Sequence, residues 1–361
     1  MTAPTPIPAD LIDETFSRTT NLASSGLNSQ IISCSDEYFA AASNLLTPTP
    51  PVHKPGVFVH TGAWYDGWET RRHNSSEYDW AIIKLGVGSG IVEGVEIDTA
   101  YFVGNYGESV LVEGAFCPTS PEADQILQQT FSRWETFLPL QPCGPSMRQA
   151  WKLSEPTTPL THVRVRMYPD GGFARIRLYG HALPPSLPAS DDIPVEELSS
   201  ALMGGLVLSA SNQHYTPASN LLLPGRGLNM GDGWETARSR VEGHVDWVIV
   251  KLGLPGSVVK VVVDTKDFRG NFPRAVRVDC ISWQKWQNSY NDGPLFDHPG
   301  WSELVKGEKR CKADTEHLFE GENDLNPTDE GGITHVKLTV IPDGGVKRFR
   351  VFGKRDTSSI S

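Results

Sequence analysis

The sequence has no long apolar run and few cysteines, and both absences narrow the class of protein. No stretch of the 361 residues is apolar for long enough to cross a bilayer. The start of the chain lacks the basic segment followed by an apolar one that marks a secretory signal. Five cysteines, an odd number, do not suggest a disulfide framework. We therefore expect a cytoplasmic protein with reduced thiols and no membrane partner.

Several signatures of binding and catalysis are also missing. No CxxC, HxH or HExxH spacing occurs, so the sequence predicts no dedicated metal site, and no cofactor is evident. Dependence on a divalent metal stays open. No glycine-rich phosphate loop follows a strand, and there is no GxSxG turn. The formal net charge of -11 argues against a nucleic-acid partner and fits a protein with a small ligand.

What the sequence does contain is a second copy of itself. The string Asp-Gly-Trp-Glu-Thr at residues 66–70 returns at residues 232–236. Further landmarks return in the same order: Asp-Thr with Gly-Asn (98–105 and 264–271), and Thr-His-Val with Pro-Asp-Gly-Gly (161–172 and 334–345). The offset is 166 residues at the first landmark and 173 at the last. So long a period indicates a duplicated domain, because solenoid units span roughly 20–50 residues.

The pattern inside each copy predicts an all-β protein. Short runs of β-branched residues that end in glycine, such as residues 80–85 and 247–252, favour strands, and helical periodicity is minor. Each half is therefore expected to be an antiparallel β-sandwich. No two cysteines match between the copies. The expected boundaries are a flexible arm (1–20), a first repeat (21–181), a proline-rich acidic linker (182–200) and a second repeat (201–354).

Near the end of each repeat, Pro-Asp-Gly-Gly predicts a hairpin turn. In that register Arg164 and Arg166 face Arg177 and Arg175, and the alternating residues point into the core: Val163, Val165, Ile176 and Leu178. Like charges that face each other are destabilising, so this face needs anions. They would come from other repeated motifs, a neighbouring subunit or an anionic ligand. We thus expect Arg164 and Arg175 to bind substrate, and the chain to form a homo-oligomer.

The repeated Asp-Gly-Trp-Glu string has two interpretations. In one it belongs to the fold: Asp66 closes a turn and Trp68 fills a gap in the core. In the other, Asp66 and Glu69 are acid–base groups, and Arg71 and Arg72 bind a carboxylate with forked geometry. The first copy keeps both arginines and the second keeps only one. The first copy is therefore the better candidate for the substrate site.

Asn105 and His162 also allow two interpretations. Gly-Asn is a common β-turn, yet the amide of Asn105 also suits a urea-like group that needs paired donors and acceptors. His162 is either a satisfied strand histidine or a proton carrier in catalysis. The second repeat has counterparts of the candidate residues at Asp232, Glu235, Arg238, Asn271 and His335.

Together these residues resemble the allantoicase family over nearly the whole chain. The resemblance rests on Ser-Asp-Glu-Tyr-Phe-Ala at 35–40, the string at 66–72, the segment 98–105 and the doubled turn motifs. It implies two tandem jelly-roll domains of the galactose-binding type. It also implies hydrolysis of allantoate, the small-molecule substrate, to ureidoglycolate and urea.

The inventory of side chains suits that reaction. Allantoate has a carboxylate and two ureido groups on one carbon, so the leaving urea needs a proton, water needs a base and the carboxylate needs a cation. Elimination through an imine and direct displacement both stay open. The second repeat lacks the acidic pair of residues 36–37, which argues against two equal sites. The alternative function is a non-catalytic protein that binds carbohydrate or another small ligand.

Overall fold

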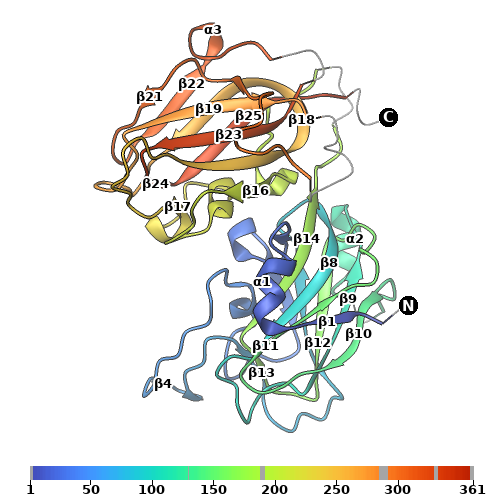
Figure 1. Cartoon of the computed structure of the whole chain (residues 1–361). Coiled ribbons are helices and arrows are strands. Elements are labelled where there is room, and N and C mark those ends of the chain that lie inside the picture. Colours follow the sequence, from blue (N-terminus) through green and yellow to red (C-terminus); the bar gives the residue numbers. More distant parts are fainter. Residues whose placement is uncertain (1–2, 129, 188–191, 284–291, 329–331, 358–361) are drawn as a thin grey trace. The chain divides into compact units, whose positions relative to one another are not determined.

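The chain forms two compact units, Met1–Leu183 and Pro184–Ser361 (Figure 1). A computed structural model describes residues 3–128, 130–187, 192–283, 292–328 and 332–357. Both units consist of antiparallel strands with only short helical turns. The fold is all-β, with one jelly-roll sandwich in each repeat, as the sequence predicts.

The first unit has two five-stranded sheets. One sheet has the order β1 (Thr5–Ile7), β11 (Arg148–Lys152), β8 (Ser89–Asp98), β14 (Arg175–Leu183) and β2 (Thr20–Asn21). The other has the order β10 (Glu135–Pro142), β9 (Ser109–Ala115), β12 (His162–Tyr168), β7 (Asp79–Lys84) and β3 (Gln30–Cys34). Short ladders join β6 (Trp68–Glu69) to β13 (Gly172–Phe173) and β4 (Phe58–Val59) to β5 (Gly62–Ala63). The helical turns are η1 (Ala9–Leu11), α1 (Ile12–Thr15), η2 (Ser25–Leu27), η3 (Ala42–Leu46) and α2 (Ser120–Gln125).

The second unit repeats this plan around one long strand, β18 (Asp246–Asp264). Its first half pairs with β16 (Leu206–Ala210) and β23 (Ile333–Ile341), and its second half with β22 (Glu316–Glu320) and β25 (Arg348–Arg355). The remaining strands are β15 (Glu196–Glu197), β19 (Ala275–Ile281), β20 (Ser302–Glu303), β21 (Lys309–Arg310), and the pair β17 (Trp234–Glu235) and β24 (Gly345–Val346). The helical turns are η4 (Ala201–Met203), η5 (Ala218–Leu222), η6 (Met230–Asp232) and α3 (Gly321–Asp324).

Period-two alternation fills the core of each sandwich. Val163 and Val165 on β12 and Ile176 and Leu178 on β14 are all 0% exposed, which confirms the side of each strand predicted to face inward. Trp68 is also 0% exposed, and its indole Nε1 donates to the carbonyl of Asp36 at 2.8 Å. A buried tryptophan of this kind contributes about 3 kcal/mol or more to stability.

The predicted hairpin between β12 and β14 is wrong, although both of its strands exist. β12 pairs with β7 and β9 in one sheet, whereas β14 pairs with β8 and β2 in the other. The Pro-Asp-Gly-Gly turn therefore carries the chain from one sheet to the opposite one. A local turn signal does not say which sheet the chain joins next, because strand pairing is decided by partners distant in sequence.

The segment expected to be a flexible arm packs against the first sandwich instead. β1 and α1 lie against the first sandwich (Figure 1), where β1 pairs with β11. Ile12 and Phe16 are buried. The ring of Phe16 stacks on Tyr179 with centroids 4.3 Å apart, and Asp13 bonds Arg148 at 2.7 Å. The sequence suggested an arm because proline and threonine are frequent there, but a few apolar residues cover the outer face of the sheet.

The predicted acidic linker contributes to the second sandwich at its end. β15 pairs with β25, and its two glutamates bond arginines of that strand: Glu196 pairs with Arg355 at 2.5 Å and Glu197 with Arg350 at 2.7 Å. These two ion pairs and the strand pairing join residues 196 and 197 to the second sandwich. The second unit therefore begins before residue 201.

The expectation that no two cysteines occupy matching positions in the repeats is wrong. The N–H of Cys143 donates to the carbonyl of Glu108, and that of Cys311 donates to the carbonyl of Arg274. These two cysteines therefore occupy matching places in the two units, although their offset of 168 residues differs from that of the nearby motifs. All five cysteines are free thiols.

We predict that Phe16→Ala destabilises the first unit by about 3 kcal/mol, because it removes a buried ring. The measurement is urea unfolding followed by fluorescence. Leu11→Ala, at a position that is 43% exposed, is the control and should change stability by less than about 0.5 kcal/mol. Equal unfolding curves for Phe16→Ala and the unmodified protein would show that the segment is not part of the core.

Candidate active site

Three repeated motifs meet at one end of the first sandwich. The short ladder of β6 and β13 places Glu69 opposite Gly172, and the N–H of Thr70 donates to the carbonyl of Gly171 at 2.9 Å. Gly171 has a φ of +133°, and a Cβ there would lie 2.8 Å from the carbonyl oxygen of Asn105. Only glycine permits this approach. The turn motif thus brings the Gly-Asn loop beside the Asp-Gly-Trp-Glu strand.

Glu69 is held by that loop through one carboxylate oxygen. The amide Nδ2 of Asn105 donates to Oε1 of Glu69 at 2.7 Å. The other oxygen, Oε2, has no hydrogen-bond partner in the described part of the chain, yet it is not sealed from solvent. Glu69 as a whole is 7% exposed. Burial raises the pKa of its carboxyl above the ordinary value, against the opposing effects of the Asn105 hydrogen bond and the Arg72 charge.

Arg72 stands beside Glu69 and is itself positioned by two acceptors. Its Nη2 donates to the carbonyl of Gly104 at 2.7 Å, and its Nη1 lies 3.3 Å from Oδ1 of Asp170. The second oxygen of Asp170 accepts the N–H of His73 at 2.8 Å. Our sequence analysis did not include Asp170 in the site. Its recurrence as Asp343 was a signal, but the turn explained it equally well.

Arg71 is engaged by a different acid. Its Nη1 lies 3.0 Å from Oδ2 of Asp36, and its guanidinium lies 4.5 Å above the ring of Tyr38. Oδ1 of Asp36 accepts the N–H groups of Arg71 and Tyr38. The side chain of Arg71 remains 59% exposed. The structure therefore gathers Glu69, Asn105 and Arg72 into one group, with Arg71 bound to an acidic loop that follows β3.

Asp66 and Arg175 are brought together with each other, not with Glu69. Oδ2 of Asp66 accepts the N–H of Val52 and a guanidinium hydrogen of Arg175, both at 2.8 Å. Arg175 also donates to the carbonyls of Thr49 and Asp66 at 3.0 Å, and its side chain is 1% exposed. These contacts fasten the loop of residues 49–66 to the sandwich, which is a structural task.

His162 and Arg164 lie elsewhere on β12. Arg164 pairs with Glu113 at 2.7 Å, and so does Arg166 at 2.9 Å, so one glutamate is shared by both arginines of this strand. His162 begins the strand whose other end leads to Asp170, roughly 20 Å away at 3.3 Å per residue. It is 2% exposed, and its Nδ1 bonds Oγ1 of Thr161 at 2.9 Å. Burial and, less strongly, the charge of Lys84 lower its pKa to about 4.

The second repeat keeps only part of this arrangement. Asn271 again donates to Oε1 of Glu235, and Asp343 again accepts a backbone N–H, from Ser239 at 2.7 Å. Arg238, however, makes no ion pair with Asp343 or with any other described residue. Asp232 is bound by Lys347, where the first repeat has Ala174. His335 is fully buried, bonds Thr334 at 2.8 Å and has its pKa lowered to about 3 by burial.

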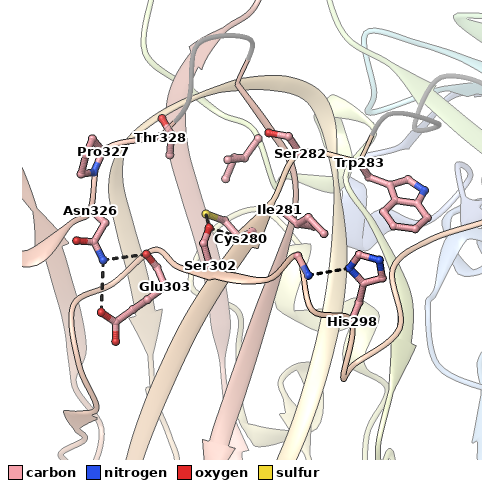
Figure 2. Close-up of a pocket in the computed structure, with 12 residues that line it drawn as sticks. Cys280, Ile281, Ser282, Trp283, His298, Ser302, Glu303, Asn326, Pro327 and Thr328 are labelled. Atoms are coloured by element: carbon pink, nitrogen blue, oxygen red, sulfur yellow. Dashed lines mark hydrogen bonds between the residues drawn. The ribbon is translucent and has the colours of Figure 1, made fainter.

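A large cavity lies apart from the repeated motifs (Figure 2). It has a volume of about 830 Å³ in the second unit. Polar groups line it, among them Cys280, Ser302, Glu303 and Asn326, and the last two are hydrogen-bonded to each other (Figure 2). No lysine or arginine is among its described lining residues. An anionic substrate would thus have no lysine or arginine partner among these described residues.

Among the described residues there is neither a cluster of metal-binding side chains nor a helix that could span a membrane. No three residues among their histidines, cysteines, aspartates and glutamates lie close enough together to hold a metal ion. None of their helices is long and apolar enough to cross a membrane.

Comparison with known proteins identifies the two units. The family model described as the allantoicase repeat matches residues 20–183 and again residues 196–356. The chain belongs to the allantoicase family. It is 52% identical to the allantoicase of Neurospora crassa, over 97% of this chain and 96% of that protein. Its identity to the allantoicase of Saccharomyces cerevisiae is 45%, over 91% and 92% of the two chains.

Solved structures agree with this assignment. The crystal structure of the Saccharomyces cerevisiae allantoicase matches with a TM-score of 0.80 at 39% identity, over 97% of this chain and 99% of that one. A second allantoicase structure matches with a TM-score of 0.78 over 94% and 97%. The two units described above are therefore two allantoicase repeats, each with the same three motifs at one end of its sandwich.

We predict that His162 makes the first unit sensitive to acid. Its pKa is about 4 in the fold and 6.5 ordinarily, so the unfolded chain binds this proton more tightly. Its contribution to stability is full above pH 6.5 and is lost as the pH falls toward 4. Urea unfolding at pH 7 and pH 5 should differ by about 2 kcal/mol from this residue. His162→Gln should have a smaller difference, and an unchanged pH dependence in that variant would contradict the assignment.

Proposed function

We propose that the first repeat carries the active site of this chain, with Glu69 as the acid–base group. As a member of the allantoicase family, the chain is a hydrolase that converts allantoate and water to ureidoglycolate and urea. One observation supports the location. Glu69 has one oxygen held by Asn105, the other without a hydrogen-bond partner among the described residues, and a raised pKa, and a guanidinium stands beside it.

The reaction breaks one bond between the central carbon of allantoate and a ureido nitrogen, and it forms a bond from that carbon to the oxygen of water. The leaving nitrogen takes up one proton and the water gives up one. A carboxyl group with a raised pKa keeps its proton to higher pH, so Glu69 is suited to donate to the leaving urea. The resulting carboxylate then accepts a proton from water. Both elimination and displacement are compatible with this exchange.

Arg72 is the cation for the substrate carboxylate in this proposal. A guanidinium has five N–H donors, of which Arg72 uses two on Gly104 and Asp170, so donors remain for a forked contact. Asp170 is a positioning residue that orients Arg72. Asn105 orients Glu69, and Arg71 adds positive charge at the rim. The contacts of Asp66, His162, Arg164 and Arg175 are internal, so we leave these residues out of the proposed site.

A protein that only binds a small ligand or carbohydrate is the alternative, and the comparisons do not favour it. Relatives named allantoicase are 45% to 52% identical over nearly the whole chain. A binding module also has no need for a carboxyl group with a raised pKa beside a guanidinium.

Self-association, a cytoplasmic location and the lack of a nucleic-acid partner stay predictions. The arginine face first given as a reason for self-association does not form, because β12 and β14 lie in different sheets, and Glu113 and Asp66 pair with three of its four arginines. The net charge of -11 still argues against a nucleic acid.

We predict that Glu69→Gln lowers kcat by about two to four orders of magnitude, as expected when an acid–base group is lost. Its thermal midpoint should change little, because the amide oxygen of glutamine still accepts from Asn105. The measurement is urea release from allantoate. Glu235→Gln is the matched control in the second repeat and should keep most of the turnover. Equal losses in both variants would mean that the two repeats build or share the site, and a fully active Glu69→Gln would reject the proposal.

We predict that Arg72→Ala mainly raises KM for allantoate, by roughly 10- to 100-fold, because it removes charge-assisted hydrogen bonds to the carboxylate. Arg72→Lys should recover only part of the affinity, since a lysine cannot form the forked contact. Steady-state kinetics measure both. A fall in kcat with an unchanged KM would place Arg72 in the chemical step instead.

A further inference from the structure

A cationic hollow lies in the second repeat. It has a volume of about 480 Å³, a size suited to a small organic ligand. Three arginines from separate segments line it: Arg238 after β17, Arg274 before β19 and Arg310 on β21. Gly270 and Phe272, which flank Asn271, also line it, as do Pro342 and Asp343 of the turn. The hollow therefore occupies the place where the repeated motifs of this unit meet.

The side chains of these three arginines are unpaired. None of them makes a side-chain hydrogen bond or ion pair with any residue in 192–283, 292–328 or 332–357. The lining has one carboxylate, Asp343, and its Oδ2 accepts the N–H of Ser239. Several other arginines of the same unit are paired, among them Arg226 with Asp264, Arg350 with Glu197, and Arg355 with Glu196.

Comparison with the first repeat shows that the positive charge of this hollow is specific to the second repeat. Cys143 and Cys311 mark equivalent points, and their N–H groups bond the carbonyls of Glu108 and Arg274 respectively. Arg274 therefore stands where the first repeat has Glu108. Arg310 pairs with Ala275 as Pro142 pairs with Ser109, so Arg310 stands where the first repeat has a proline. The second repeat has exchanged an acid and a proline for two arginines.

Three guanidinium groups that line one small hollow concentrate positive charge there, which attracts an anion. Planar guanidinium groups match the two oxygens of a carboxylate. The thiol of Cys311, which also lines the hollow, does not supply the anion, because burial raises its pKa to about 12.

We propose that the second repeat holds a separate site for a small ureide carboxylate, bound by Arg238, Arg274 and Arg310. Allantoate and ureidoglycolate, the substrate and product under the proposed function on which this inference rests, both have the required carboxylate. In the first repeat, the corresponding arginine, Arg72, is positioned by Asp170 beside the acid–base group. In the second repeat, the arginines are free to hold the anion. The first repeat thus binds and converts the substrate, and the second binds a ureide carboxylate without converting it.

The test is a titration of the Glu69→Gln protein with allantoate, which this variant should not consume. We expect two binding events per chain. Adding Arg274→Glu, which restores the residue of the first repeat at an exposed position, should weaken one event at least 10-fold and leave the other. Arg310→Ala should have the same effect to a smaller degree. Arg277→Ala is the matched control, because Arg277 is an arginine on β19 that is 48% exposed and lies outside the hollow.

Other probes separate the possible outcomes. Titration with ureidoglycolate tells whether product as well as substrate occupies the arginine site. Urea, which has no carboxylate, should not compete there. A single binding event in Glu69→Gln, two events that are unaffected by Arg274→Glu, or inorganic sulfate that binds as tightly as allantoate would each overturn the inference. Failure of the proposed function is distinct, because the unmodified protein would then release no urea from allantoate.

Discussion

The close contact between the Pro-Asp-Gly-Gly turn and the Gly-Asn loop is the constraint on which the rest of each site depends. Gly171 and Gly344 both have positive φ, and a Cβ on either would collide with the backbone carbonyl of the facing asparagine. That approach lets the turn pair with the Asp-Gly-Trp-Glu strand. It also places an asparagine amide on a glutamate in both repeats. Glycine in these turns is therefore a requirement of the site as much as of the fold.

Charge distinguishes the two repeats more than backbone does. In the first, Arg72 is engaged by Asp170, and Glu69 is a buried carboxyl group with a raised pKa. In the second, Arg238 is unpaired and is joined by two further arginines that the first repeat lacks. Duplicated domains keep the contacts that hold the chain together, while the residues around the shared loops are free to diverge. This difference supports one reacting repeat and one binding repeat.

Buried ion pairs have a structural task in both sandwiches. Arg175 and Arg348, which hold equivalent places, are almost fully buried and donate to carbonyls of the loop that precedes the repeated motif. Such arginines satisfy loop carbonyls that would otherwise lie in the interior without partners. Asp66 accepts a hydrogen bond from Arg175 and so takes part in these loop contacts. The contacts of this repeated aspartate are therefore mainly structural, although it lies near a catalytic candidate in the sequence.

The sequence alone determined the duplication, the all-β class, the inward faces of the strands and the family, because these follow from order, period and motif. It also selected Glu69, Asn105 and Arg72, which the structure brings together. Only the tertiary structure decided that β12 and β14 lie in opposite sheets, that His162 is buried far from Asp170, and that the N-terminal segment covers a sheet. The physical reason is that alternation along a strand is a local property. Which strands pair, and which side chains from distant segments converge, depends on contacts across the whole unit, as for Arg274 and Arg310.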